Sequence, residues 1–368
     1  MKWTGTDHQF MSRALQLASK GLYSTHPNPR VGCVLVKNGQ IVAEGWHRIT
    51  GGPHAEIVAL ENAGQLASGA DCYVTLEPCS HAGKTPPCTR TLIDAGVTRV
   101  VAAMADPNPL VAGQGLKELR DAGLVVESGL MEAQARKLNR GFEKRMKEQM
   151  PFVRCKLAMS VDGRTAMADG TSQWITGTEA RRDVHQLRAA SSAIMTGIDT
   201  VLRDDPRLNI REIDGIERQP LRVILDRKLR TPADARIFSC PGRVLIFTLQ
   251  EAQDNKALEA VENLEIISLA SPDRFLEQVL NNLAKERQVN EVLLECGATL
   301  AGAMLEAGLI DELVIYMAPV LLGHNARPLL NIPGIKRITD KVMLDFSEIR
   351  MVGKDCRIIL GIKNQQAV

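Results

Sequence analysis

The first part of the chain begins with two different spacings of apolar residues. Between Asp7 and Lys20 the apolar residues recur every three or four positions, which predicts a helix with Thr6 or Asp7 as its N-cap. Two apolar runs follow, Val31–Val36 and Ile41–His47, and the Asn38-Gly39 pair between them favours a primed hairpin turn. We therefore expect a helix followed by a β-hairpin.

Helices and strands alternate after this hairpin. Helical spacing is found at residues 54–66, 88–95 and 113–122, and short apolar runs lie at 72–76, 99–105 and 124–127. Alternation of this kind is typical of an α/β layered domain. The pattern therefore predicts a mixed sheet with helices on both faces.

A domain boundary is expected near residues 148–151. Helical spacing over 132–150 ends in a charged run, and Pro151 disfavours helix in the residue before it. We therefore expect one domain over residues 1–149 and a second over residues 150–368. The second domain alternates again, with strands expected at 152–158, 221–226, 243–248, 265–269, 291–295 and 312–317 and helices at 178–190, 252–261, 272–287 and 298–308.

Composition supports a folded protein and excludes some partners. A length of 368 residues exceeds one ordinary domain of about 100–200 residues, and 45% hydrophobic with 24% charged residues is close to the globular average. Lys and Arg total 45 against 43 Asp and Glu, so the net charge of +2 suggests neither a nucleic-acid nor a membrane partner, while a small charged substrate stays possible. Residues 1–21 lack the apolar core of a secretory signal, and we expect a cytoplasmic protein.

One histidine and two cysteines are spaced as ligands of a catalytic zinc ion. His54 opens the predicted helix 54–66, and Cys79 and Cys88 flank one loop. A Cys₂His set leaves the fourth coordination place open for water. Because two thiolates cancel the charge of Zn²⁺, its water is polarised less than at three neutral histidines, and a nearby base becomes more important. Glu56, two residues after His54, is the candidate for that base.

These residues match a known signature with one difference. The sequence His-x-Glu together with Pro-Cys-x-x-Cys is typical of zinc-dependent nucleobase deaminases, but here the second cysteine follows nine residues after Cys79. Taken alone, His54 or Cys88 is more simply read as a buried core residue. The complete ordered set favours a catalytic zinc site, with a purely structural zinc site as the alternative.

The motifs resemble those of one enzyme family along essentially the whole chain. Its first half contains His26-Pro-Asn-Pro-Arg-Val-Gly-Cys-Val34, His54-Ala-Glu56, Thr75-Leu-Glu-Pro-Cys-Ser-His-Ala-Gly-Lys-Thr-Pro-Pro-Cys88 and Asp106-Pro-Asn-Pro109, and its second half contains Lys156-Leu-Ala-Met-Ser-Val-Asp-Gly-Arg-Thr165, Ser172-Gln-Trp-Ile-Thr176 and Asp204-Asp-Pro206. The chain is similar to the bacterial bifunctional riboflavin-biosynthesis deaminase/reductases. This resemblance implies a zinc cytidine-deaminase-like α/β/α layered domain, followed by a dihydrofolate-reductase-like α/β domain that uses NADPH.

The resemblance also implies two reactions and a set of contacts for each. A diaminohydroxy-phosphoribosylaminopyrimidine is deaminated, and the ribosyl group of the resulting aminouracil is reduced to ribityl. Substrate contact in the first reaction is implied for Asn28, His47, His81, Lys84 and Asn108. Phosphoribosyl contact in the second is implied for Ser172, Arg188, Leu208, Arg211 and Glu295, and cofactor contact for Ala158, Trp174, Thr200, Asp204, Gly297, Ala298, Thr299, Leu300, Ala301, Gly302 and Ala303.

The residues themselves support these contacts to different degrees. Guanidinium groups bind phosphate bidentately, which suits Arg188 and Arg211, although an isolated arginine is usually a surface charge. Asn28 and Asn108 stand in proline-rich turns, where Asn is also common for backbone reasons. Trp174 could stack on a ring or belong to a satellite core.

The cofactor site is not a dinucleotide-binding Rossmann motif. Gly113-Gln-Gly115 lacks the third glycine, since Glu118 stands there. The strand expected at 291–295 instead leads through Cys296 and Gly297 into a helix, whose N-terminus could hold a pyrophosphate; Cys296 stands where related reductases often have a second glycine. Arg227, Lys228 and Arg230 could bind the extra phosphate of NADPH or simply solvate a turn.

Two other classes of function remain as alternatives. A nucleic-acid base deaminase is disfavoured by the near-neutral charge, by only 4% aromatic residues and by the long spacing between Cys79 and Cys88. A non-enzymatic, zinc-stabilised interaction protein would leave Glu56 unexplained. We expect a small-molecule phosphoribosyl-pyrimidine substrate, one zinc ion per chain, and a homo-oligomer.

Overall fold

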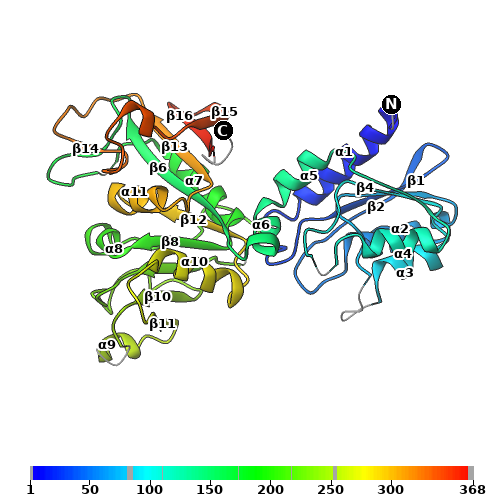
Figure 1. Cartoon of the computed structure of the whole chain (residues 1–368), viewed down its shortest axis with the longest axis horizontal. Coiled ribbons are helices and arrows are strands. Elements are labelled where there is room, and N and C mark those ends of the chain that lie inside the picture. The colour runs from blue at the N-terminus through cyan, green and yellow to red at the C-terminus, as the bar shows by residue number, and fades with distance from the viewer. Residues whose placement is uncertain are drawn as a thin grey trace. The chain divides into compact units, whose positions relative to one another are not determined.

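The computed structural model describes residues 3–80, 86–109, 111–172, 174–216, 218–251 and 255–363. The chain divides into two compact units, Met1–Met150 and Pro151–Val368 (Figure 1). Each unit has its own sheet and helices, and each is described here by itself.

The first unit contains one five-stranded mixed sheet. Its helices and strands are α1 (Gly5–Ser19), β1 (Gly32–Lys37), β2 (Gln40–Trp46), α2 (Ala55–Ala63), the short 3₁₀ helix η1 (Gly64–Ala67), β3 (Asp71–Val74), α3 (Cys88–Asp94), β4 (Arg99–Ala102), α4 (Gln114–Asp121), β5 (Val125–Ser128), α5 (Glu132–Leu138) and α6 (Arg140–Glu148). The strand order is β2-β1-β3-β4-β5. Strand β1 pairs antiparallel with β2 and β3, whereas β3, β4 and β5 are parallel.

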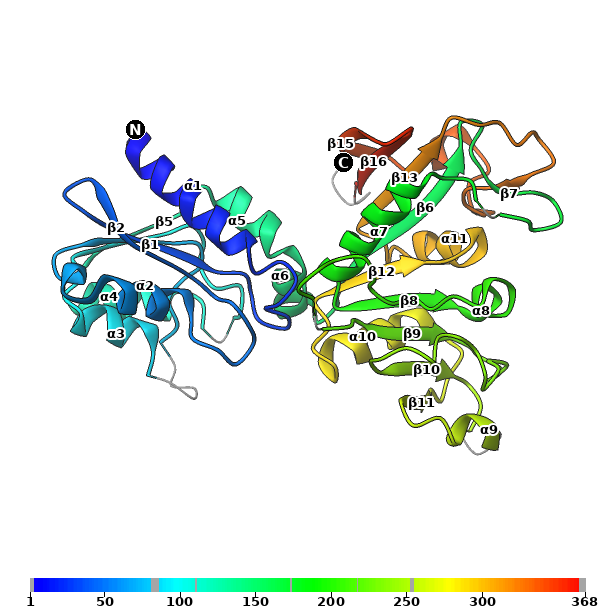
Figure 2. The same cartoon turned by 180° about the vertical axis from the view of Figure 1, so that it is seen from behind.

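Alternating strand residues give this sheet two apolar faces. Cys33 and Leu35 of β1 belong to a core with residues of α2, α3 and α4, while Val34 and Val36 belong to a second core with residues of α1 and α5. Successive side chains of a strand point to opposite faces, so one short strand serves both cores. The predicted mixed sheet with helices on both faces is confirmed (Figure 2).

Local signals at the start of the chain are confirmed in part. Asn38 and Gly39 both have positive φ, as a primed hairpin turn requires. The predicted N-cap of the first helix is wrong: Thr4 caps it, because its hydroxyl accepts from the Asp7 backbone N–H while the Asp7 carboxylate binds the Thr4 N–H. Asp7 is therefore the third residue of a capping box.

The second unit is built on a nine-stranded sheet. Its elements are β6 (Phe152–Ser160), β7 (Arg164–Ala166), α7 (Thr178–Ala190), β8 (Ala193–Gly197), α8 (Ile198–Asp204), β9 (Leu221–Leu225), β10 (Val244–Thr248), α9 (Lys256–Glu259), β11 (Leu264–Ser268), α10 (Phe275–Lys285), β12 (Glu291–Glu295), α11 (Ala298–Glu306), β13 (Glu312–Ala318), β14 (Arg327–Pro328), the 3₁₀ helix η3 (Ile338–Asp340), β15 (Leu344–Val352) and β16 (Asp355–Ile362). The strand order is β11-β10-β9-β8-β12-β6-β13-β16-β15. Only β16 and β15, at one edge, are antiparallel to their neighbours.

Helices cover both faces of this sheet. Helix α7 lies on one face and α10 on the other (Figures 1 and 2). Ala180 and Val184 of α7 pack against Val314 and Tyr316 of β13. All strands from β11 to β13 are parallel, so their carboxyl ends meet at one edge, where ligands bind in open α/β sheets.

Several helices and strands from residue 132 onward differ from the prediction. The single helix expected over 132–150 is two helices that meet at Asn139. Strands β7, β8, β14, β15 and β16 and helix α8 were not predicted, and residues 252–254 of the helix expected at 252–261 lie outside the described residues. Among the residues that the structure describes, no helix is both long enough and apolar enough to cross a membrane.

Candidate active sites

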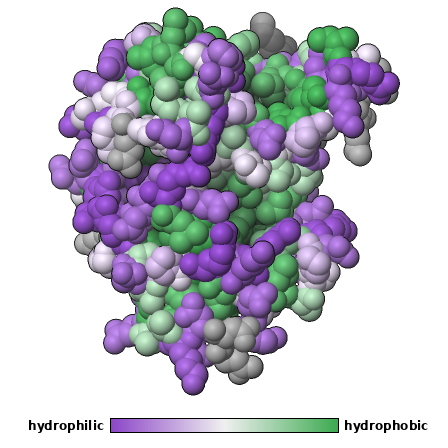
Figure 3. Space-filling model, turned by 90° about the vertical axis from the view of Figure 1, so that its left-hand side faces the viewer, coloured by the Kyte–Doolittle hydropathy of each residue, from purple (hydrophilic) through white to green (hydrophobic). Residues whose placement is uncertain are grey.

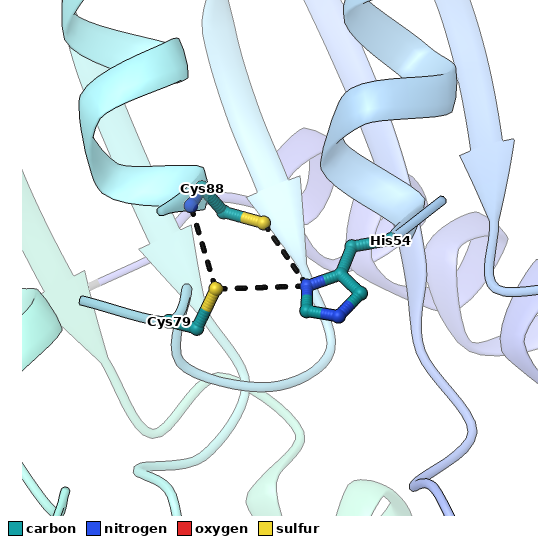
Figure 4. Close-up of side chains that lie close together, drawn as sticks. All are labelled: His54, Cys79 and Cys88. Carbon is teal, nitrogen blue, oxygen red and sulfur yellow. Dashed lines mark hydrogen bonds between the residues drawn. The ribbon is translucent and has the colours of Figure 1, made fainter. Parts of the chain in front are cut away.

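Three different elements bring one histidine and two cysteines together in the first unit. His54 is the N-cap of α2, Cys79 lies in the loop after β3, and Cys88 is the first residue of α3 (Figure 4). Their ligand atoms all lie within 4.8 Å of one another. His54 Nδ1 is 3.2 Å from Cys88 Sγ and 3.6 Å from Cys79 Sγ.

These distances fit a tetrahedral zinc ion. Zn–S and Zn–N bonds of about 2.3 and 2.0–2.1 Å at tetrahedral angles place sulfur and nitrogen roughly 3.5 Å apart, and the two observed values lie on either side of that separation. The donor set of one imidazole and two thiols is also one that zinc prefers. Within the described residues, His54, Cys79 and Cys88 are therefore the set that can hold zinc.

Close backbone packing fixes the position of His54. A Cβ atom on Gly45 of β2 would lie 2.2 Å from the Ala55 carbonyl oxygen and 2.5 Å from the Ala59 nitrogen. Only glycine allows the first turn of α2 to approach the strand this closely. The backbone N–H of Cys88, at the start of α3, donates to Cys79 Sγ at 3.4 Å. This hydrogen bond holds the Cys79 sulfur beside Cys88.

Glu56 is buried beside this set. It is 3% exposed and forms a hydrogen bond with the Cys88 thiol. Burial raises the pKa of Glu56 to about 7, against a smaller lowering by His54. A carboxyl group with a pKa near neutrality can both accept and donate a proton, as general acid–base catalysis needs.

Close polar contacts link the two sulfur atoms and the imidazole. A hydrogen bond from Cys88 lowers the pKa of the Cys79 thiol to about 4, and the same bond together with burial raises the pKa of Cys88. Hydrogen bonding to Cys79 raises the pKa of His54. Cys79 is therefore the thiol that ionises first, and a thiolate is the form that binds metal.

Asn28 and His47 form a linked pair next to this centre. The Asn28 amide lies 3.0 Å from His47 Nε2, and His47 Nδ1 lies 2.9 Å from the Pro53 carbonyl oxygen. Since a carbonyl only accepts, Nδ1 carries the proton and Nε2 accepts from Asn28. Burial lowers the pKa of His47, which keeps this neutral form, and its ring stands edge-on to His54 with centroids 5.8 Å apart.

Of the remaining predicted residues of the first site, the structure describes only Asn108. Asn108 is in the loop between β4 and α4, where its backbone N–H donates to the Asp106 carboxylate. His81 and Lys84 lie outside the described residues. The structure therefore brings Asn28, His47, His54, Glu56, Cys79 and Cys88 together around one centre.

A buried charge cluster lies at the carboxyl ends of the strands in the second unit. Arg188 of α7 forms a bidentate pair with Glu295 of β12, at 2.6 and 3.0 Å. Burial alone would raise the pKa of Glu295, but the charge of Arg188 lowers it below its usual range. Lys156 stands opposite Glu295 in the β12–β6 register, and burial lowers its pKa against the charge of Glu295.

Side chains also hold the segment that contains Leu208 and Arg211. Leu208 is buried with φ of 47°, in the left-handed region. Arg188 donates to the Asn209 carbonyl at 3.0 Å, and the Arg211 backbone N–H donates to Nδ1 of His185 at 3.2 Å. Burial, followed by the charges of Arg188 and Arg211, lowers the pKa of His185 to about 4, so this imidazole is neutral.

The predicted cofactor residues surround the same edge of the sheet. Ala158 is in β6, Thr200 and Asp204 are in α8, and Gly297 is the N-cap of α11, where a Cβ atom would meet open space. Trp174 is 70% exposed, with the Arg181 guanidinium 4.7 Å above its ring. Figure 3 shows this end of the second unit, where hydrophobic side chains lie in a hollow between hydrophilic ones.

Sequence reasoning missed two residues of this region. Lys156 and His185 stand beside Glu295, Arg188 and Arg211, but neither was assigned a role. A single lysine in a strand or histidine in a helix has no spacing signal. Only the placement of Lys156 next to the carboxyl end of β12 in a parallel sheet could have suggested it.

Comparison with known proteins assigns the family. Residues 4–104 match the cytidine and deoxycytidylate deaminase zinc-binding region, and residues 151–358 match the RibD C-terminal domain. The chain is 49% identical to the riboflavin biosynthesis protein RibD of Escherichia coli, over 96% of this chain and 99% of that protein. It is 47% identical to RibD of Haemophilus influenzae, over 97% and 98%. The chain belongs to the RibD family.

Solved RibD structures agree with both units. Form 1 of Acinetobacter baumannii RibD has a TM-score of 0.91 and 45% identity, covering 98% of this chain and 99% of that one. The Thermotoga maritima diaminohydroxyphosphoribosylaminopyrimidine deaminase/5-amino-6-(5-phosphoribosylamino)uracil reductase has a TM-score of 0.87 and 35% identity, covering 97% and 99%. The predicted cytidine-deaminase-like and dihydrofolate-reductase-like folds are confirmed.

RibD membership defines what the protein does. It is a bifunctional enzyme of riboflavin biosynthesis, with a zinc-dependent deaminase and an NADPH-dependent reductase in one chain. It acts on small molecules. The predicted zinc and NADPH are confirmed at the level of the family, and the His54, Cys79 and Cys88 cluster supplies a zinc site in this chain.

Proposed function

We propose that the first unit deaminates 2,5-diamino-6-(5-phosphoribosylamino)pyrimidin-4-one and that the second unit reduces the ribosyl group of 5-amino-6-(5-phosphoribosylamino)uracil to ribityl. The Thermotoga maritima relative is named for these two reactions. The observation that carries the first assignment is the tetrahedral spacing of His54, Cys79 and Cys88 with Glu56 buried beside them. The Arg188–Glu295 cluster supports the second.

Glu56 moves the proton in the deamination. His54, Cys79 and Cys88 would hold the zinc ion, which when bound would supply a water molecule of lowered pKa. Glu56 accepts a proton from that water, whose oxygen adds to the amino-bearing ring carbon. The carboxyl group then gives the proton to the departing nitrogen, the carbon–nitrogen bond breaks, and ammonia leaves.

Asn28, His47 and Asn108 orient the pyrimidine, together with His81 and Lys84. The bond from Asn28 to His47 leaves the amide oxygen of Asn28 as an acceptor for an N–H of the substrate. His47 therefore acts mainly by fixing which way this amide faces. This role predicts that changing either His47 or Asn28 raises the Michaelis constant of deamination, because both changes disturb the same hydrogen bond to the substrate.

The second site holds a phosphoribosyl group against the cofactor. Arg188 and Arg211 provide cationic donors to the phosphate, and Ser172, Leu208 and Glu295 complete the contacts. When bound, NADPH would supply the hydride. The residues that would hold it are Ala158, Trp174, Thr200, Asp204, Gly297, Ala298, Thr299, Leu300, Ala301, Gly302 and Ala303. The ribosyl C1 receives the hydride, the bond from this carbon to the ring oxygen opens, and that oxygen takes a proton.

The boundary proposed for the two activities is residues 1–149 and 150–368. Its support is that the compact units meet between Met150 and Pro151. A fragment that ends at Met150 should release ammonia without NADPH, and one that starts at Pro151 should reduce the deaminated intermediate without zinc. Soluble, folded but inactive fragments would contradict the proposed independence of the sites.

We also propose that the protein is a cytoplasmic homo-oligomer. The edge strand β15 exposes Phe346, Ile349 and Met351, at 70%, 60% and 63%. The bulge between Phe346 and Glu348 places all three opposite Leu360, Ile358 and Cys356 of β16, on one face. An apolar edge of this kind is usually covered in the native assembly. Sedimentation of the Phe346→Asp variant should show a smaller species than the parent.

The proposed substrates are tested by the products. With the diaminopyrimidine, zinc-loaded protein should release one ammonia per substrate, and NADPH should be oxidised only after that release. Ammonia release from RNA but not from the free pyrimidine nucleotide would contradict the proposal.

A further inference from the structure

Glu77 is a buried carboxylate with an unusual set of partners. It is 4% exposed, and its Oε2 accepts from the backbone N–H groups of Asp106 and Gly113, at 2.9 and 3.0 Å. Its Oε1 accepts from those of Gly115 and Leu116, at 2.9 and 3.3 Å. All four donors belong to residues 106–116, which lead from β4 into α4.

Three of these bonds cap α4 from outside the helix. The N-cap of α4 is Gly113, which has no side chain to bind the free N–H groups of the first turn. Glu77 binds the N–H groups of Gly113, Gly115 and Leu116 instead. A negative charge at a helix N-terminus is also favoured by the helix dipole.

The first turn of α4 packs closely against Glu77 and Pro78. A Cβ atom on Gly115 would lie 2.1 Å from the Pro78 carbonyl oxygen and 3.3 Å from Glu77 Oε1. The first turn of α4 therefore rests directly on the peptide that leads to Cys79. Glycine at position 115 is therefore needed for Glu77 to bind the start of α4.

The loop held by Glu77 contains Asn108. Glu77 binds this loop at both ends, at Asp106 and at Gly113. Inside it, the Asp106 carboxylate accepts from the Asn108 backbone N–H at 2.8 Å, and the Asn108 carbonyl accepts from Val111 and Ala112. The position of Asn108 is thus set relative to Glu77 by a short series of hydrogen bonds.

The same carboxylate is connected to the zinc ligands. Cys79 follows Glu77 by two residues, and its carbonyl accepts from the Thr89 backbone and hydroxyl groups. The Thr89 hydroxyl also lies 2.9 Å from a carboxylate oxygen of Glu118 in α4. Hydrogen bonds of Thr89 therefore join helix α4, the Cys79 loop and the start of α3 (Figure 4 shows the last two).

We infer that Glu77 is a positioning residue of the deaminase, which holds the Asn108 loop at the correct distance from the zinc ligands. This inference rests on the proposed contact between Asn108 and substrate. A glutamine could not replace it, because an amide offers one acceptor oxygen and presents an N–H₂ donor to two of the four N–H groups. The loop would then lose its attachment at one end.

The test is a double-mutant cycle with Asn108. Glu77→Gln should raise the Michaelis constant for deamination by about 10- to 150-fold, the effect of losing a hydrogen bond to a charged group, with kcat much less affected. Asn108→Ala should raise it similarly. In the Asn108→Ala background, Glu77→Gln should add almost nothing, since both changes remove the same contact.

The controls separate positioning from a general loss of structure. Zinc content and reductase turnover of the full-length Glu77→Gln protein should equal those of the parent. Glu127→Gln, which alters a partly buried carboxylate that binds Arg99 on the same sheet, should leave the Michaelis constant unchanged. If Glu77→Gln does not fold, Asp106→Ala loosens the same loop more gently and should raise the same constant by a smaller factor.

Two results would overturn the inference. Additive effects of Glu77→Gln and Asn108→Ala would show that Glu77 does not act through Asn108. Loss of zinc with an unchanged Michaelis constant in the remaining loaded protein would make Glu77 a support of the metal site. If Asn108→Ala alone has no effect, the proposed substrate contact itself is wrong.

Discussion

The two sites of this chain are assembled in different ways. In the first unit, the three candidate zinc ligands and Glu56 lie within residues 54–88. His54, Glu56 and Cys88 are at the starts of helices α2 and α3, and Cys79 is in the loop after β3. In the second unit, the proposed site residues are spread from Ala158 to Ala303, and two of them, Arg188 and Glu295, pair with each other. The first site needs a bound metal ion to complete it, whereas in the second site the charges of Arg188 and Glu295 already balance each other.

This difference predicts which property of each site a mutation changes. In the proposed mechanism Glu56 is the one proton carrier of the zinc site, so changing Glu56 should affect the rate of deamination more than stability. The reductase site has a buried ion pair between α7 and β12, so changing one member leaves the other charge unpaired. Mutations in the first site should therefore change mainly the rate of deamination, whereas mutations in the second site should also change stability.

The largest expected effect is on the rate of deamination. Glu56→Gln keeps the three zinc ligands and the buried volume but cannot carry a proton. Deamination should fall by at least about 10²–10⁴-fold, with zinc content and NADPH oxidation on the deaminated intermediate unchanged. Near-normal ammonia release would remove Glu56 from the mechanism, and loss of zinc would make it a structural support.

The next effect concerns stability of the reductase. Arg188→Met leaves Glu295 buried without its bidentate partner, which should destabilise the second unit by about 3–5 kcal/mol. Arg243→Met removes an exposed pair with Glu265 and should cost about 1 kcal/mol or less. Denaturant unfolding of the two full-length variants, followed by circular dichroism, measures the difference. Equal midpoints would show that burial of the pair has no consequence.

A smaller effect is expected on cofactor choice. Arg230 pairs with Asp199, and the guanidinium of Arg227 lies 4.8 Å from the Phe275 ring centre. If Arg227 and Lys228 bind the 2′-phosphate, changing both to alanine should raise the Michaelis constant for NADPH about 10- to 150-fold and leave that for NADH almost unchanged. An unaltered NADPH to NADH preference would place the phosphate elsewhere.

The effect that is smallest per pH unit is a dependence of stability on pH. Because the pKa of His185 is lowered to about 4 in the folded protein, the unfolded chain binds more protons at this position between about pH 4 and 6.5. Its contribution is complete above pH 6.5 and is lost as pH falls towards 4, by at most about 1.4 kcal/mol per pH unit. His185→Gln keeps an acceptor for the Arg211 N–H and should flatten this slope. An identical slope in the variant would show that His185 does not titrate in this range.

The sequence predicted most of what depends on local pattern. The hairpin at Asn38-Gly39, the mixed sheet and the set of His54, Glu56, Cys79 and Cys88 all have a signal within a short segment. The break at Asn139 has none, because its cause is tertiary: the Asn139 amide binds both the N–H and the carbonyl of Arg30. An amide engaged in this way ends α5 although the helical spacing continues.

Other features were missed because their signal is spread over distant segments. Strand β8 has only five residues, Ala193–Gly197, and it is a strand because it pairs with β9 and β12. Strand β15 carries charged residues among its apolar ones, and a bulge changes its alternation. Lys156 and Glu77 gain their partners only when the parallel strands and loops come together.

The central claim, one chain with two independent chemistries, is tested most directly by measuring both reactions before and after zinc is removed. A chelator should abolish ammonia release from the diaminopyrimidine and leave NADPH oxidation on the deaminated intermediate unchanged, and added zinc should restore the first. Parallel loss of both activities in protein that remains folded, or deamination that survives complete removal of zinc, would contradict the account.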